Sequence, residues 1–111
     1  MDCVNEVVNV AYAESRGETQ QGIRSVIHVI LNRARALGKR PCFVVKQKGQ
    51  FARGIHRPSD PKWQEIKRLV LSPGSDITRG ATYFHNLTVR PAWSYKMKVT
   101  LKLNKHIFYK A

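Results

Sequence analysis

The sequence is poor in acidic residues. Only seven Asp and Glu stand against twenty Lys and Arg among 111 residues, which gives a formal net charge of +13. A charge of this size says little about the fold, but it indicates a polyanionic partner. Nucleic acid, the stem-peptide carboxylates of peptidoglycan and anionic envelope polymers such as teichoic acids all fit that description. The charge alone therefore leaves the partner open.

Long hydrophobic runs and a secretory signal are also missing. No stretch approaches the roughly 20 apolar residues of a membrane-spanning helix, although 42 % of the residues are hydrophobic. The segment from Met1 to Glu6 contains no basic residues followed by an apolar block, as a secretory signal would. We therefore expect a soluble, monomeric protein that is made in the cytoplasm of its cell or host. The length fits one domain spanning residues 1–111.

Cysteine is scarce as well. Cys3 and Cys42 allow at most one disulfide and match no zinc-ligand spacing. Because no export signal is present, we expect both thiols to be reduced and structural, and a bridge between them is the open alternative.

The sequence lacks the patterns of several other catalytic sites. None of the histidines forms the paired motif of a zinc hydrolase, and no Gly-x-Ser-x-Gly segment is present. The histidines are His28, His56, His85 and His106. We therefore predict no metal site and no cofactor.

Apolar residues at helical spacing predict three helices, at about Asp2 to Arg16, about Thr19 to Gly38, and Asp60 to Ser72. In the third, Asp60 is expected to cap the helix that the following proline begins. Residues 39–58 mix Gly, Pro and basic residues without a sustained period. That segment is therefore predicted to be an irregular loop.

The last third of the chain changes to a strand pattern. Ala81–His85 is rich in β-prone residues, and Met97–Leu103 alternates apolar residues with Lys and Thr. Asn104 and Lys105 can turn this strand into His106–Tyr109, because Asn tolerates the positive φ that tight hairpins need. Helices first and a small antiparallel sheet last predict an α+β fold.

Glu14 is the carboxylate best placed for chemistry. It lies on the shoulder of the apolar stripe of the first predicted helix, one turn after Val10, so we expect it to be half buried. Burial raises the pKa of a carboxyl and keeps a proton donor available near neutral pH, whereas the nearby Arg16 would act in the opposite direction. We predict that Glu14 is a general acid, with a surface carboxylate as the alternative. Glu18 is more simply explained as favourable charge at the start of the next helix.

Aromatic residues gather in the second half of the chain, beside polar side chains such as Gln50, Thr82 and Asn86. The aromatics are Phe51, Tyr83, Phe84, Trp93, Phe108 and Tyr109. Aromatic faces next to amides suit sugar rings, and stacking on nucleic-acid bases or plain core packing are the alternatives. Trp93 lies in a predicted loop, so it is the aromatic that we most expect to face a ligand.

Eight segments are informative as an ordered set. They are Ala11–Glu18, Gln21–Gly22, Val29–Arg33, Cys42–Val45, Gln50–Phe51, Asp76–Asn86, Pro91–Trp93 and His106–Tyr109. In this order the chain resembles the SleB-type cell-wall hydrolase family, which includes the catalytic domain of spore cortex-lytic enzymes and related phage lysins. One departure is Asn104, in a turn where that family usually has a glycine.

The resemblance implies a lysozyme-like α+β fold and cleavage of the glycan strand of peptidoglycan, with Glu14 as the catalytic acid. Together with side-chain chemistry it assigns substrate binding to Glu18, Asn32, Gln50, Phe51, Thr82, Tyr83, His85, Trp93 and His106. The missing export signal favours a phage endolysin or a virion-associated lysin, which would reach the wall and periplasm after release or from the virion.

The supply of carboxylates favours one reaction. A hydrolysing glycosidase needs a second carboxylate about 5 to 10 Å from the acid, and no other Asp or Glu forms an obvious pair with Glu14. Glu14 would then act twice, first as acid and then as base for the muramyl C6 hydroxyl, which gives a 1,6-anhydro product. We therefore predict a lytic transglycosylase. The alternatives are a hydrolytic muramidase with a water held by Glu18, a zinc amidase, and a basic nucleic-acid-binding module.

Overall fold

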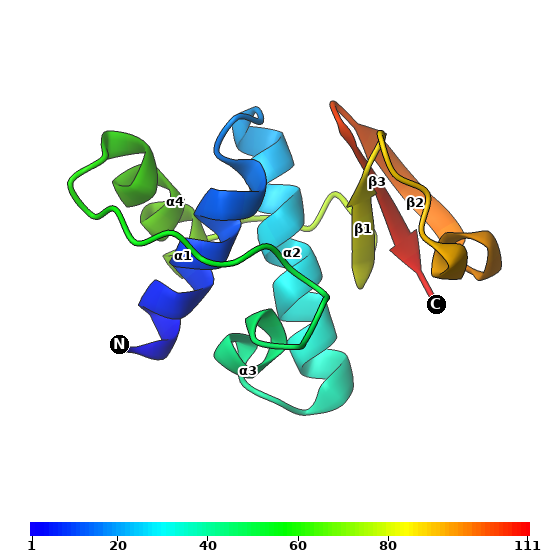
Figure 1. Cartoon of the computed structure of the whole chain (residues 1–111), viewed down its shortest axis with the longest axis horizontal. Coiled ribbons are helices and arrows are strands. Elements are labelled where there is room, and N and C mark those ends of the chain that lie inside the picture. The colour runs from blue at the N-terminus through cyan, green and yellow to red at the C-terminus, as the bar shows by residue number, and fades with distance from the viewer.

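Helix α2 runs through the middle of the molecule, between helices α1 and α4 on one side and a small sheet on the other (Figure 1). The computed structural model describes all residues 1–111. The elements are α1 (Cys3–Ser15), α2 (Gln20–Leu37), α3 (Pro41–Val45), α4 (Pro61–Leu71), β1 (Tyr83–Asn86), the 3-10 helix η1 (Ala92–Lys96), β2 (Lys98–Leu103) and β3 (His106–Lys110). Helices precede one antiparallel sheet, so the predicted α+β class is confirmed.

The first two helices begin and end where their capping residues predict. Asp2 accepts a hydrogen bond from the backbone N–H of Asn5 at 2.8 Å, and Thr19 accepts one from that of Gly22 at 3.2 Å. These side chains satisfy N–H groups that no helical carbonyl can reach. Helix α2 closes at Gly38, whose φ of 64° is left-handed and suits glycine. The predicted bounds of both helices are confirmed to within one residue.

The prediction of an irregular loop over residues 39–58 is wrong in part, because the chain forms the short helix α3 there. Pro41 occupies the first turn, where a helix does not need the N–H that proline lacks. Val44 and Val45 are buried, and α3 packs against both α1 and α2. Five residues are too few to display a helical period, so the sequence pattern could not reveal this element.

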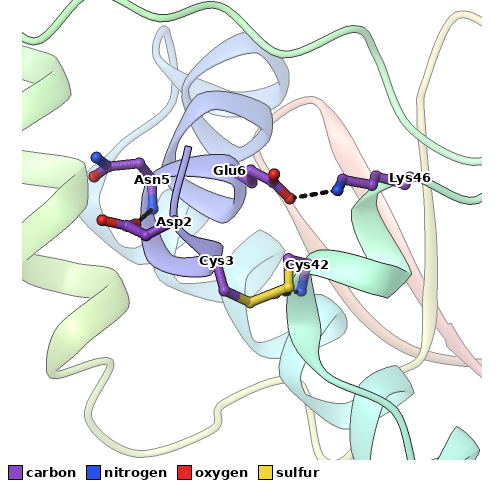
Figure 2. The surroundings of a disulfide bond; sticks show 6 residues. All are labelled: Asp2, Cys3, Asn5, Glu6, Cys42 and Lys46. Atoms are coloured by element: carbon purple, nitrogen blue, oxygen red, sulfur yellow. Dashed lines mark hydrogen bonds and ion pairs between the residues drawn. A yellow bond between two sulfur atoms is a disulfide. The ribbon is translucent and has the colours of Figure 1, made fainter.

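A disulfide between Cys3 and Cys42 joins α1 to α3 (Figure 2). The expectation that both thiols are reduced is therefore wrong. It rested on the missing export signal, and a sequence separation of 39 residues gives no sign that the two Cα atoms lie 5.1 Å apart. An ion pair of 2.9 Å between Glu6 and Lys46 adds a second link between α1 and the residues that follow α3 (Figure 2).

The strands form an antiparallel sheet in the order β1-β3-β2. Strands β2 and β3 meet at a tight turn in which Asn104 has a φ of 54°, so the predicted hairpin is confirmed. Strand β3 is central, and its Phe108 pairs with Phe84 of β1. A bulge between Val99 and Leu101 interrupts the pairing of β2 with β3.

Two apolar clusters meet on helix α2. On one side Val29 and Ile30 pack with α3 and with Phe108 of the sheet. On the other side Ile27 packs with α1 and with Trp63 of α4. None of the helices combines the length and the apolar composition needed to cross a membrane. The shared helix brings the end of α1 and the sheet to one region of the surface, where the candidate site lies.

Candidate active site

A cavity of about 280 Å³ opens between the end of α1, the middle of α2 and the sheet. It is lined by Glu14, Arg33, Gly49, Gln50, Tyr83, Phe84, His85, Asn86, Val89, Pro91, Trp93 and His106. Glu14 is the only carboxylate among these residues. The cavity therefore combines a single acid with aromatic, amide and basic side chains.

Glu14 occupies the last turn of α1 and is half buried, as its place on the apolar stripe predicts. Burial raises the pKa of this carboxyl and outweighs a hydrogen bond with the backbone of Ala52, which acts in the opposite direction. The expected influence of Arg16 is not seen, because its guanidinium lies over the ring of Tyr12, 5.0 Å from the centroid. The result is an unpaired acid that holds its proton to a higher pH than an exposed glutamate would.

Arg33 is the cation of the cavity and is 6 % exposed. Its guanidinium carbon lies 4.2 Å from the ring centroid of Tyr83 and 5.0 Å from that of Phe51. Burial lowers the pKa of Arg33, and Tyr83 has the opposite effect. Sequence reasoning assigned no role to Arg33. The available signal was an arginine within the buried stripe of α2, next to Ala34.

An aromatic wall forms where β1, η1 and β3 meet. The ring of Trp93 lies 5.1 Å from that of Tyr83, 5.8 Å from that of His85 and 5.3 Å from that of Tyr109. The Nδ1 atom of His85 lies 2.8 Å from the carbonyl oxygen of Asn86, and its Nε2 atom lies 2.7 Å from the Tyr109 hydroxyl. A carbonyl can only accept, so Nδ1 donates and Nε2 accepts from Tyr109. These bonds hold the wall in one geometry.

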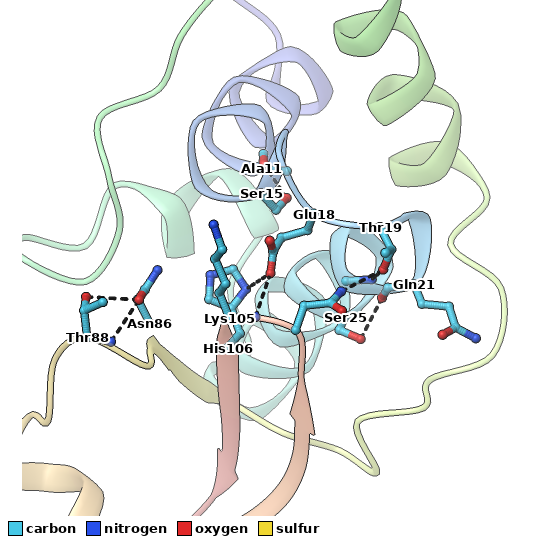
Figure 3. A network of polar contacts seen from close by, with 12 residues as sticks. Ala11, Ser15, Glu18, Thr19, Gln21, Ser25, Asn86, Thr88, Lys105 and His106 are labelled. Carbon is cyan, nitrogen blue, oxygen red and sulfur yellow. Dashed lines mark hydrogen bonds and ion pairs between the residues drawn. The ribbon is translucent and has the colours of Figure 1, made fainter.

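Glu18 is not among the residues that line the cavity. Its side chain points to Lys105 and His106 of the β2–β3 hairpin (Figure 3). Its Oε1 atom accepts a hydrogen bond from the backbone N–H of Lys105 at 3.3 Å and lies 3.5 Å from Nδ1 of His106. Burial lowers the pKa of His106, and the Glu18 carboxylate has the opposite effect. Asn104 adds a hydrogen bond of 2.8 Å to Thr19. Glu18 therefore positions His106, which does line the cavity.

Glycine at position 22 makes this arrangement fit. A Cβ atom at Gly22 would lie 2.9 Å from Cβ of Glu18 and 3.3 Å from Nδ2 of Asn104. Any larger residue would push the Glu18 side chain or the hairpin away. The Gln21–Gly22 segment therefore has a packing role beside the site.

The structure brings five of the nine predicted binding residues to the cavity, namely Gln50, Tyr83, His85, Trp93 and His106. The other four are Glu18, Asn32, Phe51 and Thr82. Asn32 donates hydrogen bonds of 2.9 Å to the Asp76 carboxylate and to the carbonyl oxygen of Ala81, so it holds the segment that leads into β1. Thr82 lies with Asn32 along a separate shallow depression.

Phe51 lines a separate depression of about 520 Å³, and its ring contacts the Arg33 guanidinium. The remaining residues that line the cavity were not assigned to substrate binding, and they are Arg33, Gly49, Phe84, Asn86, Val89 and Pro91. Phe84 and Asn86 nevertheless belong to the aromatic and amide side chains that the sequence indicated as suited to sugar rings. Four of the unassigned residues are adjacent in the chain to a predicted binding residue, so proximity in the chain was the usable signal; these are Arg33, Gly49, Phe84 and Asn86.

No group of three or more His, Cys, Asp or Glu side chains lies close enough together to hold a metal ion.

A protein-family model described as Cell Wall Hydrolase matches residues 17–109, which is most of the chain. The chain belongs to the cell wall hydrolase family. The matched range begins three residues after Glu14, so the match does not cover that residue. A comparison with curated protein sequences finds no match.

Two solved structures have the same fold as this chain. The catalytic domain of the germination-specific lytic transglycosylase SleB from Bacillus anthracis is 28 % identical with a TM-score of 0.81, over 96 % of this chain and 93 % of that one. The catalytic domain of the Bacillus cereus SleB protein is 27 % identical with a TM-score of 0.73, over 96 % and 88 %. The predicted resemblance to SleB-type hydrolases and the lysozyme-like architecture are thereby confirmed.

Proposed function

We propose that this protein cleaves the glycan strand of peptidoglycan and that Glu14 is its general acid. The carboxyl would protonate the oxygen that links N-acetylmuramic acid to the next N-acetylglucosamine, while the bond from that oxygen to muramyl C1 breaks. Three observations support this role: Glu14 lines the cavity, it is half buried, and its pKa is raised by burial. Membership of the cell wall hydrolase family supports the substrate class.

We further propose that the reaction is a lytic transglycosylation. The observation that carries this proposal is that Glu14 is the only carboxylate lining the cavity. Hydrolysis by two carboxylates needs the second about 5 to 10 Å from the first. Glu18 is the nearest acid along the chain, and its carboxylate is engaged by Lys105 and His106.

In this mechanism the ionised Glu14 takes a proton from the C6 hydroxyl of the same muramic acid. The C6 oxygen then forms a bond to C1 and yields the 1,6-anhydro sugar. Glu14 ends the cycle protonated, as it began. No water and no second acid take part, which fits the composition of the cavity. The SleB protein of Bacillus anthracis is itself described as a lytic transglycosylase.

The other side chains of the cavity suit a sugar ligand. Trp93 and Tyr83 offer aromatic faces for the apolar side of a pyranose ring. Gln50 and Asn86 carry amides that can bond to hydroxyl and N-acetyl groups. These groups would hold the ring in position for Glu14.

Digestion of purified peptidoglycan, followed by mass analysis of the products, tests the proposal. The expected products end in 1,6-anhydro-muramic acid. Reducing-end muramic acid would instead establish a hydrolytic muramidase, and freed stem peptides would establish an amidase. The Glu14→Gln variant should release no products, whereas Glu65→Gln is a matched control because Glu65 pairs with Lys62 on α4, outside the cavity.

A further inference from the structure

Arg33 is a buried cation without an anionic partner. Its Nε atom donates to the carbonyl oxygen of Thr82 at 2.9 Å. Its Nη1 atom donates to the side-chain oxygens of Gln47 and Gln50 at 3.2 and 3.4 Å. All three acceptors are neutral, and the ion pairs of the molecule do not include Arg33.

The second amino group of Arg33, Nη2, makes no hydrogen bond within the protein. It is not sealed away from solvent either, because it is not among the fully buried polar atoms that lack a partner. Since Arg33 lines the cavity, Nη2 is the donor that remains available to a ligand there.

The position of the guanidinium is fixed before any ligand arrives. It lies against the rings of Tyr83 and Phe51, and its bond to Thr82 ties it to the chain just before β1. A buried charge with only neutral partners is unfavourable, and an opposite charge brought close to it gains more than it would in water. A carboxylate can accept a charge-assisted hydrogen bond from the free Nη2, and such bonds are stronger than those between neutral groups.

We propose that Arg33 binds a carboxylate carried by the muramic acid substituent, so that the enzyme prefers charged peptidoglycan to its neutral counterpart. This inference rests on the proposed function. The N-acetylated sugar rings are uncharged, so the anion must come from the lactyl group of muramic acid or from the peptide attached to it. Two sources share this chemistry: the free carboxylates of the stem peptide, and the lactyl carboxylate exposed when the stem peptide is removed.

The test compares three substrates prepared from one batch of peptidoglycan. The first is native, the second has lost its stem peptides and exposes lactyl carboxylates, and the third has its free carboxylates converted to carboxamides. We expect the wild type to cleave the carboxamide substrate at least about tenfold more slowly than the native one, measured as kcat/KM. Fast cleavage of the second substrate would identify the lactyl carboxylate as the anion, and slow cleavage would identify the stem peptide.

The positive charge of the whole protein also favours anionic substrates. Variants are therefore needed to show whether the preference depends on Arg33. Arg33→Gln should lower the ratio of native to carboxamide rates several-fold, to the small preference that the remaining positive charge of the protein produces. Arg35→Gln is the matched control, because it removes the same charge from an exposed position on the same helix, outside the cavity. It should leave the ratio almost unchanged.

Partial unfolding of Arg33→Gln does not confuse the result, because the ratio is measured on one enzyme sample and the folded fraction cancels. Arg33→Lys provides a second reading, since it keeps the charge and loses the planar fork, and it should give an intermediate ratio. Equal wild-type rates on all three substrates would overturn the inference, as would a ratio that persists in Arg33→Gln. If Glu14→Gln is inactive in the same experiment, the proposed function stands even where the results with the Arg33 variants overturn the inference.

Discussion

The two ends of helix α1 differ in what surrounds their glutamates. At the N-terminal end, Glu6 pairs with Lys46 beside the disulfide that ties α1 to α3 (Figure 2). Just beyond the C-terminal end, Glu18 is held by the hairpin (Figure 3). Glu14, between them, has no cationic partner and faces the cavity.

This comparison shows how a fold can keep one acid ready for proton transfer. A cation or several hydrogen bonds would favour the ionised form and lower the pKa of a carboxyl, whereas burial without a partner raises it. The anchored end of α1 gives the helix a fixed position, and the other end leaves Glu14 unpaired. Under the proposed function, the residues for stability and the residue for chemistry thus lie at separate ends of one helix.

The largest effect is expected when Glu14, the glutamate without a cationic partner, is replaced. Glu14→Gln should lower the rate of glycan cleavage by at least about 10²-fold, because it removes the group that gives and takes the proton. The fold should be retained, since glutamine has the same shape and avoids the burial of a charge. Product release from purified peptidoglycan and a thermal melt of the same sample measure the two effects. Wild-type activity in this variant would reject Glu14 as the acid.

The opposite end of α1 is expected to govern stability. Replacing Cys3 and Cys42 together by Ser should lower the free energy of unfolding by about 4 kcal/mol, as expected for a loop of this length. Denaturant unfolding of the double variant against the oxidised wild type measures this change. Well below the unfolding transition, kcat/KM should stay close to the wild-type value. A large loss of activity in a fully folded sample would show that the two ends are not separate.

Glu18→Gln sharpens the comparison between the two neighbouring acids. Its amide oxygen can still accept from Lys105, so we expect a loss of only about 1 kcal/mol in stability and a few-fold loss in kcat/KM. Because the Glu18 carboxylate raises the pKa of His106, the variant should lower that pKa further. An NMR titration of the His106 ring measures the shift. If Glu18 instead held a catalytic water, this variant would lose activity as completely as Glu14→Gln.

The smallest expected effect is a pH dependence of stability. The pKa of Glu14 is higher in the folded state than in the unfolded state, so its contribution is fully present below the unfolded pKa and is lost as pH rises through the folded pKa. Glu14→Gln has no such loss. The stability of the variant relative to the wild type should therefore increase over that pH range, as measured by unfolding at several pH values. A constant difference would mean that the carboxyl is not desolvated.

Much of the fold could be predicted from local patterns. The caps Asp2, Thr19 and Asp60 mark helix starts because their side chains accept bonds from free N–H groups. Asn104 marks the hairpin because it tolerates positive φ. Helix α3 could not be predicted, since its five residues depend on packing against α1 and α2.

The candidate site could be predicted only in part, because side-chain chemistry does not show where the backbone directs a residue. Trp93 and His85 have side chains that suit a sugar, so their chemistry pointed to the cavity that they line. Thr82 and Asn32 have equally suitable side chains, but the backbone turns them elsewhere. Side-chain type could not distinguish these two pairs.

The sequence alone determined the three longer helices, the hairpin and the presence of one half-buried glutamate at the end of α1, because each depends on periodicity and capping within a few residues. Only the tertiary structure decided that Cys3 meets Cys42, that Glu18 holds His106, and that Arg33 lies in the cavity without an anionic partner. These relations join residues far apart in the chain or depend on where a side chain points. They arise from packing across elements, which no local pattern encodes.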